Sequence, residues 1–458
     1  MPAPIFWAEE GGVWRRRLGG MEKFYLTLAS PEGEPVHWMV GCCVSFSYHG
    51  NDDVDIAQTI RRAWIATQLG LPSVASTIDR ARGEIVVASD TSSSGIDEWL
   101  SRSFKVHDDA SASADDLFSG FRSQLHITLH FLRGPSQLLI QAPHALLDGR
   151  GSLHLLHALF TALAHPDSAA QSSVPVSSAS LTSPYDTWLG LSPQIPAEKD
   201  VQAAQSIFRT VMDQKQPIRL PGVNFDSLPR RALHVELIMT ENITESIIAA
   251  CKQRGVTVTS AWHAALAMAT KAIQSAAGES GTSFVQFTTI DLRRWFPPHF
   301  RPRQDSIGSL QTALPFALDL GADDTFEALS QTLHGRGCYG DPFAFAEGDF
   351  NYLTPYMAAS TQLLEAGGAV PPSSTPSLSS MGVIDHLLPP AGYGAWEPTG
   401  FWISSTMLTA DIQMYLWTFR GRLTFSVCYN EGFYGVGEVD ALLEETRSQL
   451  LTGLGIDA

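Results

Sequence analysis

The sequence predicts an α+β protein made of two halves of similar make-up. Strand-like apolar runs and helix-like amphipathic patterns alternate in both halves, and 458 residues exceed one ordinary domain. A serine-rich segment at residues 167–184 separates the halves. Because such a composition cannot bury a core, we expect an exposed crossover there. The predicted lobes are therefore residues 1–205 and 206–458.

In the first half, three predicted elements stand out. Residues 54–68 carry apolar side chains at helical spacing and predict a long amphipathic helix. Residues 123–142 predict two strands, joined by a glycine- and proline-containing turn at 133–136. Apolar residues then repeat with helical spacing over 153–163, which predicts a second helix.

The second half begins with a predicted strand followed by two helices. Gly255 should end the first of these helices as its C′ residue, and Thr259 should begin the second as its N-cap. The predicted strands are 234–238, 284–290, 311–318 and two or three within 401–428, broken at Arg420-Gly421, and the predicted helices are 245–253, 261–273 and 436–451.

Composition limits the kind of protein that this chain can be. The net charge of −17 argues against nucleic acid as a partner and, more weakly, against anionic membranes. No run approaches the ~18 apolar residues of a spanning helix, and Met1 to Arg17 lacks the apolar core of a signal peptide. The five cysteines lack metal-ligand spacing, and the adjacent Cys42 and Cys43 lie in an apolar run that predicts core packing. We therefore expect a reduced, cytoplasmic protein without a metal site.

The segment Pro143–Gly149, PHALLDG, is the most informative motif of the chain. It lies between a predicted strand and a predicted helix, a common position for catalytic side chains. His144 can exchange a proton near neutral pH and is a candidate general base. Asp148 could orient the imidazole, as in a catalytic triad, or brace the loop through an arginine, and the four-residue spacing favours the brace. Gly149 would free the backbone to turn.

For this heptapeptide alone, a hydrogen-bonded histidine and a capping aspartate would be the favoured interpretation. The order strand, HxxxDG, helix nevertheless resembles the active-site segment of the chloramphenicol-acetyltransferase-like superfamily. That superfamily includes plant BAHD acyltransferases, peptide-synthetase condensation domains and fungal trichothecene O-acetyltransferases. Further segments that resemble it, in the same order along the chain, are Ala63-Trp64, 256–266, 289–293, 309–316 and 429–434.

The resemblance implies two lobes, each a mixed β-sheet flanked by helices, with the active-site channel between them. It implies that His144 is the general base and that Asp148 braces the loop. Arg293 would be the partner of Asp148, with Asp291 as a supporting residue of the same segment, and Gly149 would permit the turn.

Two departures from the superfamily pattern narrow the resemblance. Condensation domains carry two consecutive histidines, whereas Pro143 stands at the first of these positions here. The plant enzymes carry a DFGWG motif, of which Tyr393-Gly394-Ala395-Trp396 is only a faint echo. The first departure favours a stand-alone acyltransferase over a peptide-synthetase domain, and the second argues against the plant-type enzymes. The serine-rich segments favour a divergent branch of fungal specialised metabolism, closest in character to the trichothecene-type O-acetyltransferases.

The implied reaction is direct transfer of an acyl group, expected to be acetyl, from a thioester, expected to be acyl-CoA, to a hydroxyl of a small metabolite. A tetrahedral oxyanion needs hydrogen-bond donors, and backbone amides near Gly149 could supply some of them. The side chains expected to donate to the oxyanion or to line the substrate pocket are Ser404, Ser405, Thr406, Thr409, Gln413 and Tyr415.

Arg293, Arg294, Arg301 and Arg303 fall within eleven positions. They could form a solvated charged loop or an anion site. In the second case Arg301 and Arg303 would contact a CoA phosphate, because Asp148 should occupy Arg293. Acyl-CoA would then be a cosubstrate, with no permanently bound cofactor and no metal. We expect a monomer whose partners are the small-molecule acceptor and the thioester donor.

Three other functions share these residues. The acyl donor could be a carrier protein, as in a condensation domain. His144 could instead deprotonate a carbon acid and promote a condensation or cyclisation without any acyl donor. A degenerate binding module is disfavoured because His144, Asp148 and Arg293 are all present.

Overall fold

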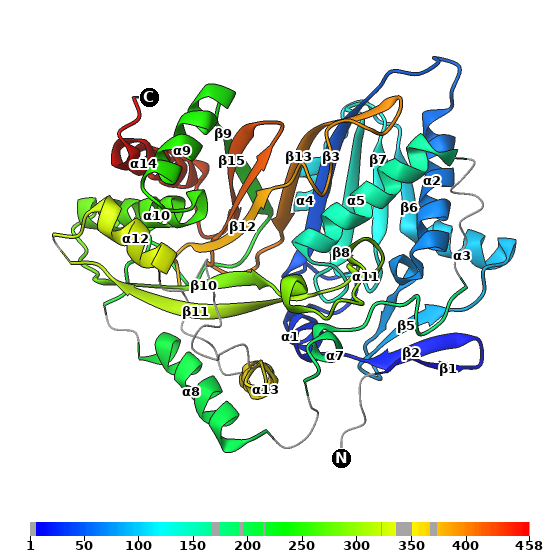
Figure 1. Cartoon of the computed structure of the whole chain (residues 1–458), viewed down its shortest axis with the longest axis horizontal. Coiled ribbons are helices and arrows are strands. Elements are labelled where there is room, and N and C mark those ends of the chain that lie inside the picture. The colour runs from blue at the N-terminus through cyan, green and yellow to red at the C-terminus, as the bar shows by residue number, and fades with distance from the viewer. Residues whose placement is uncertain are drawn as a thin grey trace.

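The computed structural model describes residues 6–166, 175–191, 196–213, 216–321, 323–335, 350–366 and 373–457. Their strands form two large mixed sheets and one small antiparallel sheet, and helices pack beside each large sheet (Figure 1). The predicted α+β architecture of two lobes is therefore confirmed.

The N-terminal lobe is built on a five-stranded sheet. The predicted helices are present as α2 (Ile56–Gly70) and α5 (Gly149–Ala164), and they pack against each other beside the sheet. In strand order the sheet consists of β13 (Trp396–Ser405), β3 (Met39–Tyr48), β8 (Gln137–Pro143), β7 (Thr128–Leu132) and β6 (Phe104–His107). The small sheet of the same lobe consists of β1 (Ala8–Glu10), β2 (Val13–Arg17), β5 (Glu84–Ala88) and β4 (Thr77–Asp79).

The C-terminal lobe is built on a six-stranded sheet, on the left in Figure 1. In order its strands are β11 (Gln311–Asp319), β10 (Ser283–Asp291), β12 (Ser377–Val383), β14 (Gln413–Phe419), β15 (Arg422–Asn430) and β9 (Ala232–Ile238). The helices packed together beside this sheet are α9 (Glu241–Gln253), α10 (Val258–Ala276), α12 (Phe326–Gly335) and α14 (Val436–Leu454).

Three further helices meet below the two large sheets in Figure 1. Helix α13 (Leu353–Glu365) contacts both α1 (Gly20–Leu28) and α8 (Glu198–Met212), and α8 also contacts β11. The remaining short helices are η1 (Pro72–Ala75), α3 (Ser93–Ser103), α4 (Ala114–Ser119), α7 (Tyr185–Trp188), η2 (Arg293–Trp295) and α11 (Pro302–Asp305).

The local signals for helix ends were partly right. Gly255 follows α9 with φ of +67°, as expected of a C′ glycine. The predicted N-cap of the next helix was wrong, because the N-cap of α10 is Thr257, two residues before Thr259. The Thr257 hydroxyl accepts a hydrogen bond from the Ser260 amide, and the Ser260 hydroxyl accepts one from the Thr257 amide. This reciprocal capping box stabilises the earlier start over one at Thr259.

One strand of the second half of the chain lies in the N-terminal sheet. β13 pairs antiparallel with β3, and the next strand, β14, belongs to the C-terminal sheet. The chain between them, residues 406–412, therefore crosses from one lobe to the other. The sequence-based boundary at residue 205 falls within α8.

The structure bears on three further predictions, which concern the cysteines, the serine-rich segment and membrane-spanning helices. Cys42 and Cys43 are buried in the core, as expected. Residues 167–174 of the serine-rich segment and Cys338 lie outside the described residues. Within the described ranges, no helix is both long and apolar enough to cross a bilayer.

Five buried histidines predict that the fold loses stability in mild acid. Burial lowers their pKa to about 3 or about 4, against 6.5 in the unfolded chain; they are His37, His130, His144, His154 and His263. Because the unfolded state binds these protons more readily, stability is full above pH 6.5 and falls as the pH drops toward 4. Each group contributes a slope of up to about 1.4 kcal/mol per pH unit in that window.

Burial also raises the pKa of Glu236 to about 7 and of Asp186 to about 6. These two groups favour the folded state as the pH falls, but the five histidines outnumber them. The free energy of unfolding, measured with urea, should therefore fall from pH 7 to pH 5. His263→Gln should reduce the pH dependence by about one proton, because glutamine does not titrate. A free energy of unfolding that is equal or higher at pH 5 would contradict this explanation.

Candidate active site

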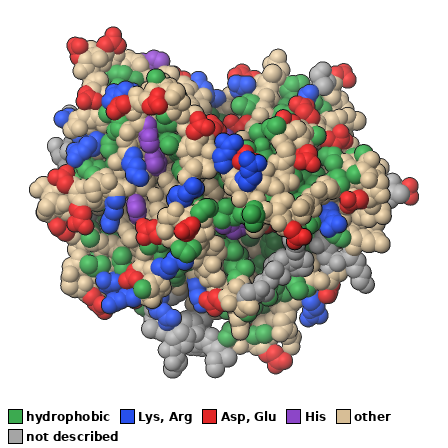
Figure 2. Space-filling model, turned by 180° about the vertical axis from the view of Figure 1, so that it is seen from behind, with side chains coloured by type: hydrophobic (Ala, Val, Ile, Leu, Met, Phe, Trp, Pro, Cys, Tyr) green, Lys and Arg blue, Asp and Glu red, His purple; other side chains and the backbone are tan. Residues whose placement is uncertain are grey.

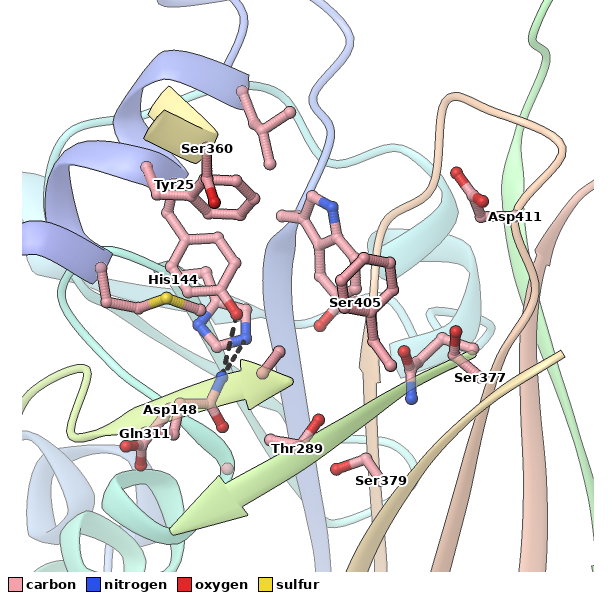
Figure 3. Close-up of a pocket in the computed structure, with 18 of the residues that line it drawn as sticks. Tyr25, His144, Asp148, Thr289, Gln311, Ser360, Ser377, Ser379, Ser405 and Asp411 are labelled. Atoms are coloured by element: carbon pink, nitrogen blue, oxygen red, sulfur yellow. Dashed lines mark hydrogen bonds between the residues drawn. The ribbon is translucent and has the colours of Figure 1, made fainter. Parts of the chain in front are cut away.

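His144 lies where β8 ends and the chain turns toward α5, as the strand–loop–helix pattern predicted. Its imidazole stacks on the ring of Tyr25, with ring centroids 3.9 Å apart and planes 7° apart, and Trp38 meets its edge at 5.9 Å. The side-chain amide of Gln311 donates to the Tyr25 hydroxyl at 2.9 Å and approaches His144 Nε2 at 3.4 Å (Figure 3). Three side chains therefore hold the ring of His144 in place.

The environment of His144 keeps the imidazole neutral. Burial lowers its pKa to about 4, while its own backbone carbonyl and the negative charge of Asp148 oppose that shift. At neutral pH the ring therefore has a free lone pair. The ring nitrogen that faces the Gln311 amide is Nε2, which is the accepting nitrogen in the tautomer protonated at Nδ1. Nε2 is thus the atom that could take a proton.

Asp148 is buried and has three hydrogen-bond donors around its carboxylate. Its Oδ1 accepts from the Gly151 amide at 2.7 Å, which makes Asp148 the N-cap of α5. Its Oδ2 accepts from the Leu310 amide at 2.7 Å, from the segment that leads into β11. The guanidinium of Arg293 donates to Oδ1 at 2.9 Å. The carboxylate therefore joins the motif loop to two segments of the second half of the chain.

Arg293 is itself fully engaged by the protein. It donates to Asp291 at 2.8 Å and to the backbone oxygen of Ser306 at 3.0 Å, in addition to Asp148. Burial alone would lower the pKa of Arg293, but the two carboxylates raise it above the ordinary value. Asp291 also pairs with Arg150 at 3.2 Å. The predicted group of Asp148, Arg293 and Asp291 is thus brought together in space.

The expected role of Gly149 differs from what the structure shows. Gly149 is the first residue of α5, and its φ is outside the left-handed region, so no special backbone freedom is needed there. Gly151 is the more constrained position. A Cβ on Gly151 would lie 2.8 Å from the backbone oxygen of Ser306 and 3.1 Å from Asp148 Oδ1. Close approach of α5 to the backbone at Ser306 therefore requires this glycine.

A cavity of about 430 Å³ adjoins His144 and is lined by both lobes. Its volume is typical of sites for small molecules. The motif contributes His144, Asp148 and Gly149, the last residue of β13 contributes Ser405, and the crossing segment contributes Met407, Thr409 and Asp411. From behind, hydrophobic side chains surround a recess near the middle of the molecule (Figure 2).

Of the side chains expected in the pocket or near the oxyanion, four line this cavity and two do not. Ser405, Thr409, Gln413 and Tyr415 line it. The expectation for Ser404 and Thr406 was wrong, because side chains alternate along a strand and both flank Ser405. Ser404 is fully buried, and the Thr406 hydroxyl accepts from the Met39 amide at 3.0 Å.

Neither Arg301 nor Arg303 lines the cavity, and protein groups engage both. Arg301 pairs with Asp305 at 2.7 Å and donates to the backbone oxygen of Ala179. Arg303 donates to the backbone oxygens of Leu387 and His386. That Arg301 and Arg303 bind a CoA phosphate stays a prediction, and the bonds that both make to the protein argue against it.

Sequence reasoning did not find Tyr25, Trp38 or Gln311. No motif marks them, and they lie far along the chain from His144. The only available signal was the position of Gln311 at the start of a segment, 309–316, that resembles the superfamily.

No family model matches the chain. It is 24% identical to the O-acetyltransferase pigM of Monascus ruber, over 93% of this chain and 82% of that protein. It is 26% identical to the acetyltransferase pigO of the same fungus, over 98% of each. The solved structure of TRI3 trichothecene 15-O-acetyltransferase from Fusarium sporotrichioides matches with a TM-score of 0.80 at 17% identity, covering 99% of both chains.

The chain has the chloramphenicol-acetyltransferase-like fold. The expected resemblance to fungal O-acetyltransferases of trichothecene type is also confirmed by these similarities.

Asp148→Asn should destabilise the protein by about 3 kcal/mol. All three partners of Asp148 are donors, and asparagine offers one accepting oxygen together with an amide that also donates. Asparagine is a good N-cap, so the loss should come from the buried charge of Arg293 and not from α5. Urea unfolding measures the change.

Asp291→Asn is the matched control, because it removes the more exposed of the two carboxylates that contact Arg293. Its effect on stability should be less than half as large. An Asp148→Asn protein that unfolds at the same urea concentration as the wild type would show that this ion pair does not brace the loop.

Proposed function

We propose that this chain is an acyltransferase that moves an acetyl group from acetyl-CoA to a hydroxyl of a small specialised metabolite. The observation that carries the proposal is the neutral His144 in the wall of a cavity lined by both lobes. The similarity to acetyltransferases of Monascus ruber supports the reaction type and the kind of metabolism.

His144 would act as the general base. As the acceptor oxygen attacks the thioester carbonyl, its proton passes to Nε2 of His144. The negative charge of the tetrahedral intermediate raises the affinity of the buried imidazole for this proton. When the carbon–sulfur bond breaks, the thiolate of CoA leaves, and the imidazolium can return the proton to sulfur. The histidine ends neutral, so no other acid is required.

Ser405 would donate a hydrogen bond to the oxyanion. Its Oγ accepts from the hydroxyl of Tyr415 at 3.1 Å, so its own hydrogen can point into the cavity that both residues line. Ser405 pairs with Val40 in β3, and Val40 pairs with Ala142, two residues before His144. Ser405 is therefore two strands away from the end of β8, about 10 Å across the sheet. A thioester carbonyl between the two residues could reach both.

No observation favours the alternative reactions over this one. A carrier-protein donor and a cyclisation without any donor both use His144 in the same way. The donor is therefore proposed from the reaction type of the similar proteins.

His144→Ala should lower kcat/KM about 10²- to 10⁴-fold, the usual contribution of a positioned base. The readout is release of CoA from acetyl-CoA in the presence of an alcohol acceptor. Unfolding in urea provides the control, because the variant should remain folded. Unchanged turnover in a folded His144→Ala protein would exclude His144 as the base.

Ser405→Ala should lower kcat about 10²-fold with little change in KM, because the hydroxyl would act only on the developing charge. Tyr415→Phe should have a smaller effect on kcat, since it removes only the bond that orients Ser405. Steady-state kinetics for both substrates separate these effects. A rise in KM at constant kcat would instead place Ser405 in ground-state binding.

A further inference from the structure

The cavity has two chemically different walls. One is apolar and is formed by helices α1, α8 and α13 through Phe24, Leu28, Phe208, Val211 and Leu363. The other is polar and is formed by the C-terminal sheet and the crossing segment through Thr289, Ser377, Ser379, Asp411 and Gln413. A ligand that fits both walls has an apolar body with polar groups along one side.

The polar wall holds hydrogen-bonding groups that the protein does not use. Within the described ranges, the hydroxyls of Thr289, Ser377 and Ser379 have no protein partner in hydrogen-bond range. Ser380, next along β12, differs because its hydroxyl bonds to that of Thr259 at 2.8 Å. Groups that face a cavity and lack protein partners are free to bind a ligand.

Asp411 differs from the other carboxylates of the cavity. Asp148 and Asp291 both pair with Arg293, whereas no basic side chain of the described residues pairs with Asp411. The hydroxyl of Thr409 donates to its Oδ2 at 2.5 Å, which holds the carboxylate in place. Burial raises the pKa of Asp411, and the bond from Thr409 opposes this. A hydrogen-bond donor on a ligand would therefore stabilise the charged form of this carboxylate, which has no basic partner in the described residues.

Asp411 lies away from the reacting end of the cavity. In Figure 3 it and Ser377 lie on the opposite side of the view from His144. The backbone of Ser377 donates to the oxygen of Ile412, so Ser377 and Asp411 are neighbours in space. Tyr415, which bonds to Ser405, is four residues from Asp411, a separation of at most about 14 Å along the chain. An acceptor whose hydroxyl lies between His144 and Ser405 could therefore extend toward Asp411.

We propose that Asp411, together with Ser377, is the subsite that selects the acceptor. It would take acceptors that carry a hydrogen-bond donor at the end remote from the reacting hydroxyl, with a protonated amine preferred over a second hydroxyl. The amine is preferred because it supplies the positive charge that Asp411 lacks. This inference rests on the proposed acyltransferase function, since it names the acceptor of the same cavity.

The test compares three acceptors of equal length that differ only at the remote end: 1-octanol, 1,8-octanediol and 8-amino-1-octanol. With acetyl-CoA as donor, kcat/KM for O-acetylation should be at least tenfold higher for the amino alcohol than for octanol, with the diol between them. Liquid chromatography separates the O-acetyl and N-acetyl products, which have the same mass, and fragmentation in the mass spectrometer identifies each. Equal values of kcat/KM for the three acceptors would overturn the subsite while leaving the acyltransferase function intact.

Asp411→Asn should remove at least tenfold from kcat/KM for the amino alcohol and leave octanol unchanged. Ser377→Ala should produce a smaller loss in the same direction. Ser380→Ala is the matched control, because its hydroxyl is already paired, and it should keep the wild-type order. An Asp411→Asn protein that keeps the full preference for the amine would exclude Asp411 as its partner.

A binding measurement separates this inference from the proposed function. Octylammonium binding, measured by calorimetry, should weaken at least tenfold in Asp411→Asn and not in Ser380→Ala. If binding weakens in this way but none of the three acceptors is acetylated, the subsite is supported and acetyl transfer to simple alcohols is contradicted. Equal binding to wild type and Asp411→Asn would overturn the subsite whatever the kinetics show.

Discussion

The buried ion pair between Asp148 and Arg293 is the interaction on which the site depends. A carboxylate that is 1% exposed is stable only if charged or donating groups surround it, and here they come from three separate segments. The hydrogen bonds to Asp148 therefore fix the positions of three segments relative to one another. These are the start of α5, the η2 turn that carries Arg293, and the residues just before β11. The close contact at Gly151 allows the helix to come near enough for the pair to form.

The position of His144 follows from that constraint. The loop held by Asp148 begins at His144, and the segment held through Leu310 continues directly into Gln311, which approaches the imidazole. Burial lowers the pKa of His144 to about 4 and outweighs the opposing effect of the Asp148 charge, so the imidazole stays neutral. Asp148 thus carries the charge that holds the loop, while His144, four positions earlier in the sequence, carries the neutral imidazole.

The crossing of the chain from β13 to β14 gives the cavity its other wall. Because β13 pairs in the N-terminal sheet and β14 in the C-terminal sheet, the segment between them must pass along the space between the lobes. Ser405 lies just before this segment, at the end of β13, and Asp411 lies within it, toward the far side of the cavity from His144. Recognition of an acceptor can therefore vary at Asp411 without disturbing the base or its brace.

The sequence alone predicted the motif and the strand and helix on either side of it, because hydrophobic spacing, turn residues and the order strand–HxxxDG–helix are local properties. It did not predict the cavity-lining elements α1, α8, α13 and β12. Tertiary structure decided which residues meet. Tyr25 and Gln311 contact each other across 286 positions, a proximity that no local pattern contains. A strand reverses its facing side at every residue, so a pocket residue such as Ser405 can be distinguished from Ser404 and Thr406 only once its sheet partners are known. The packing of the two lobes around the buried Asp148 carboxylate decides which side chains face the cavity.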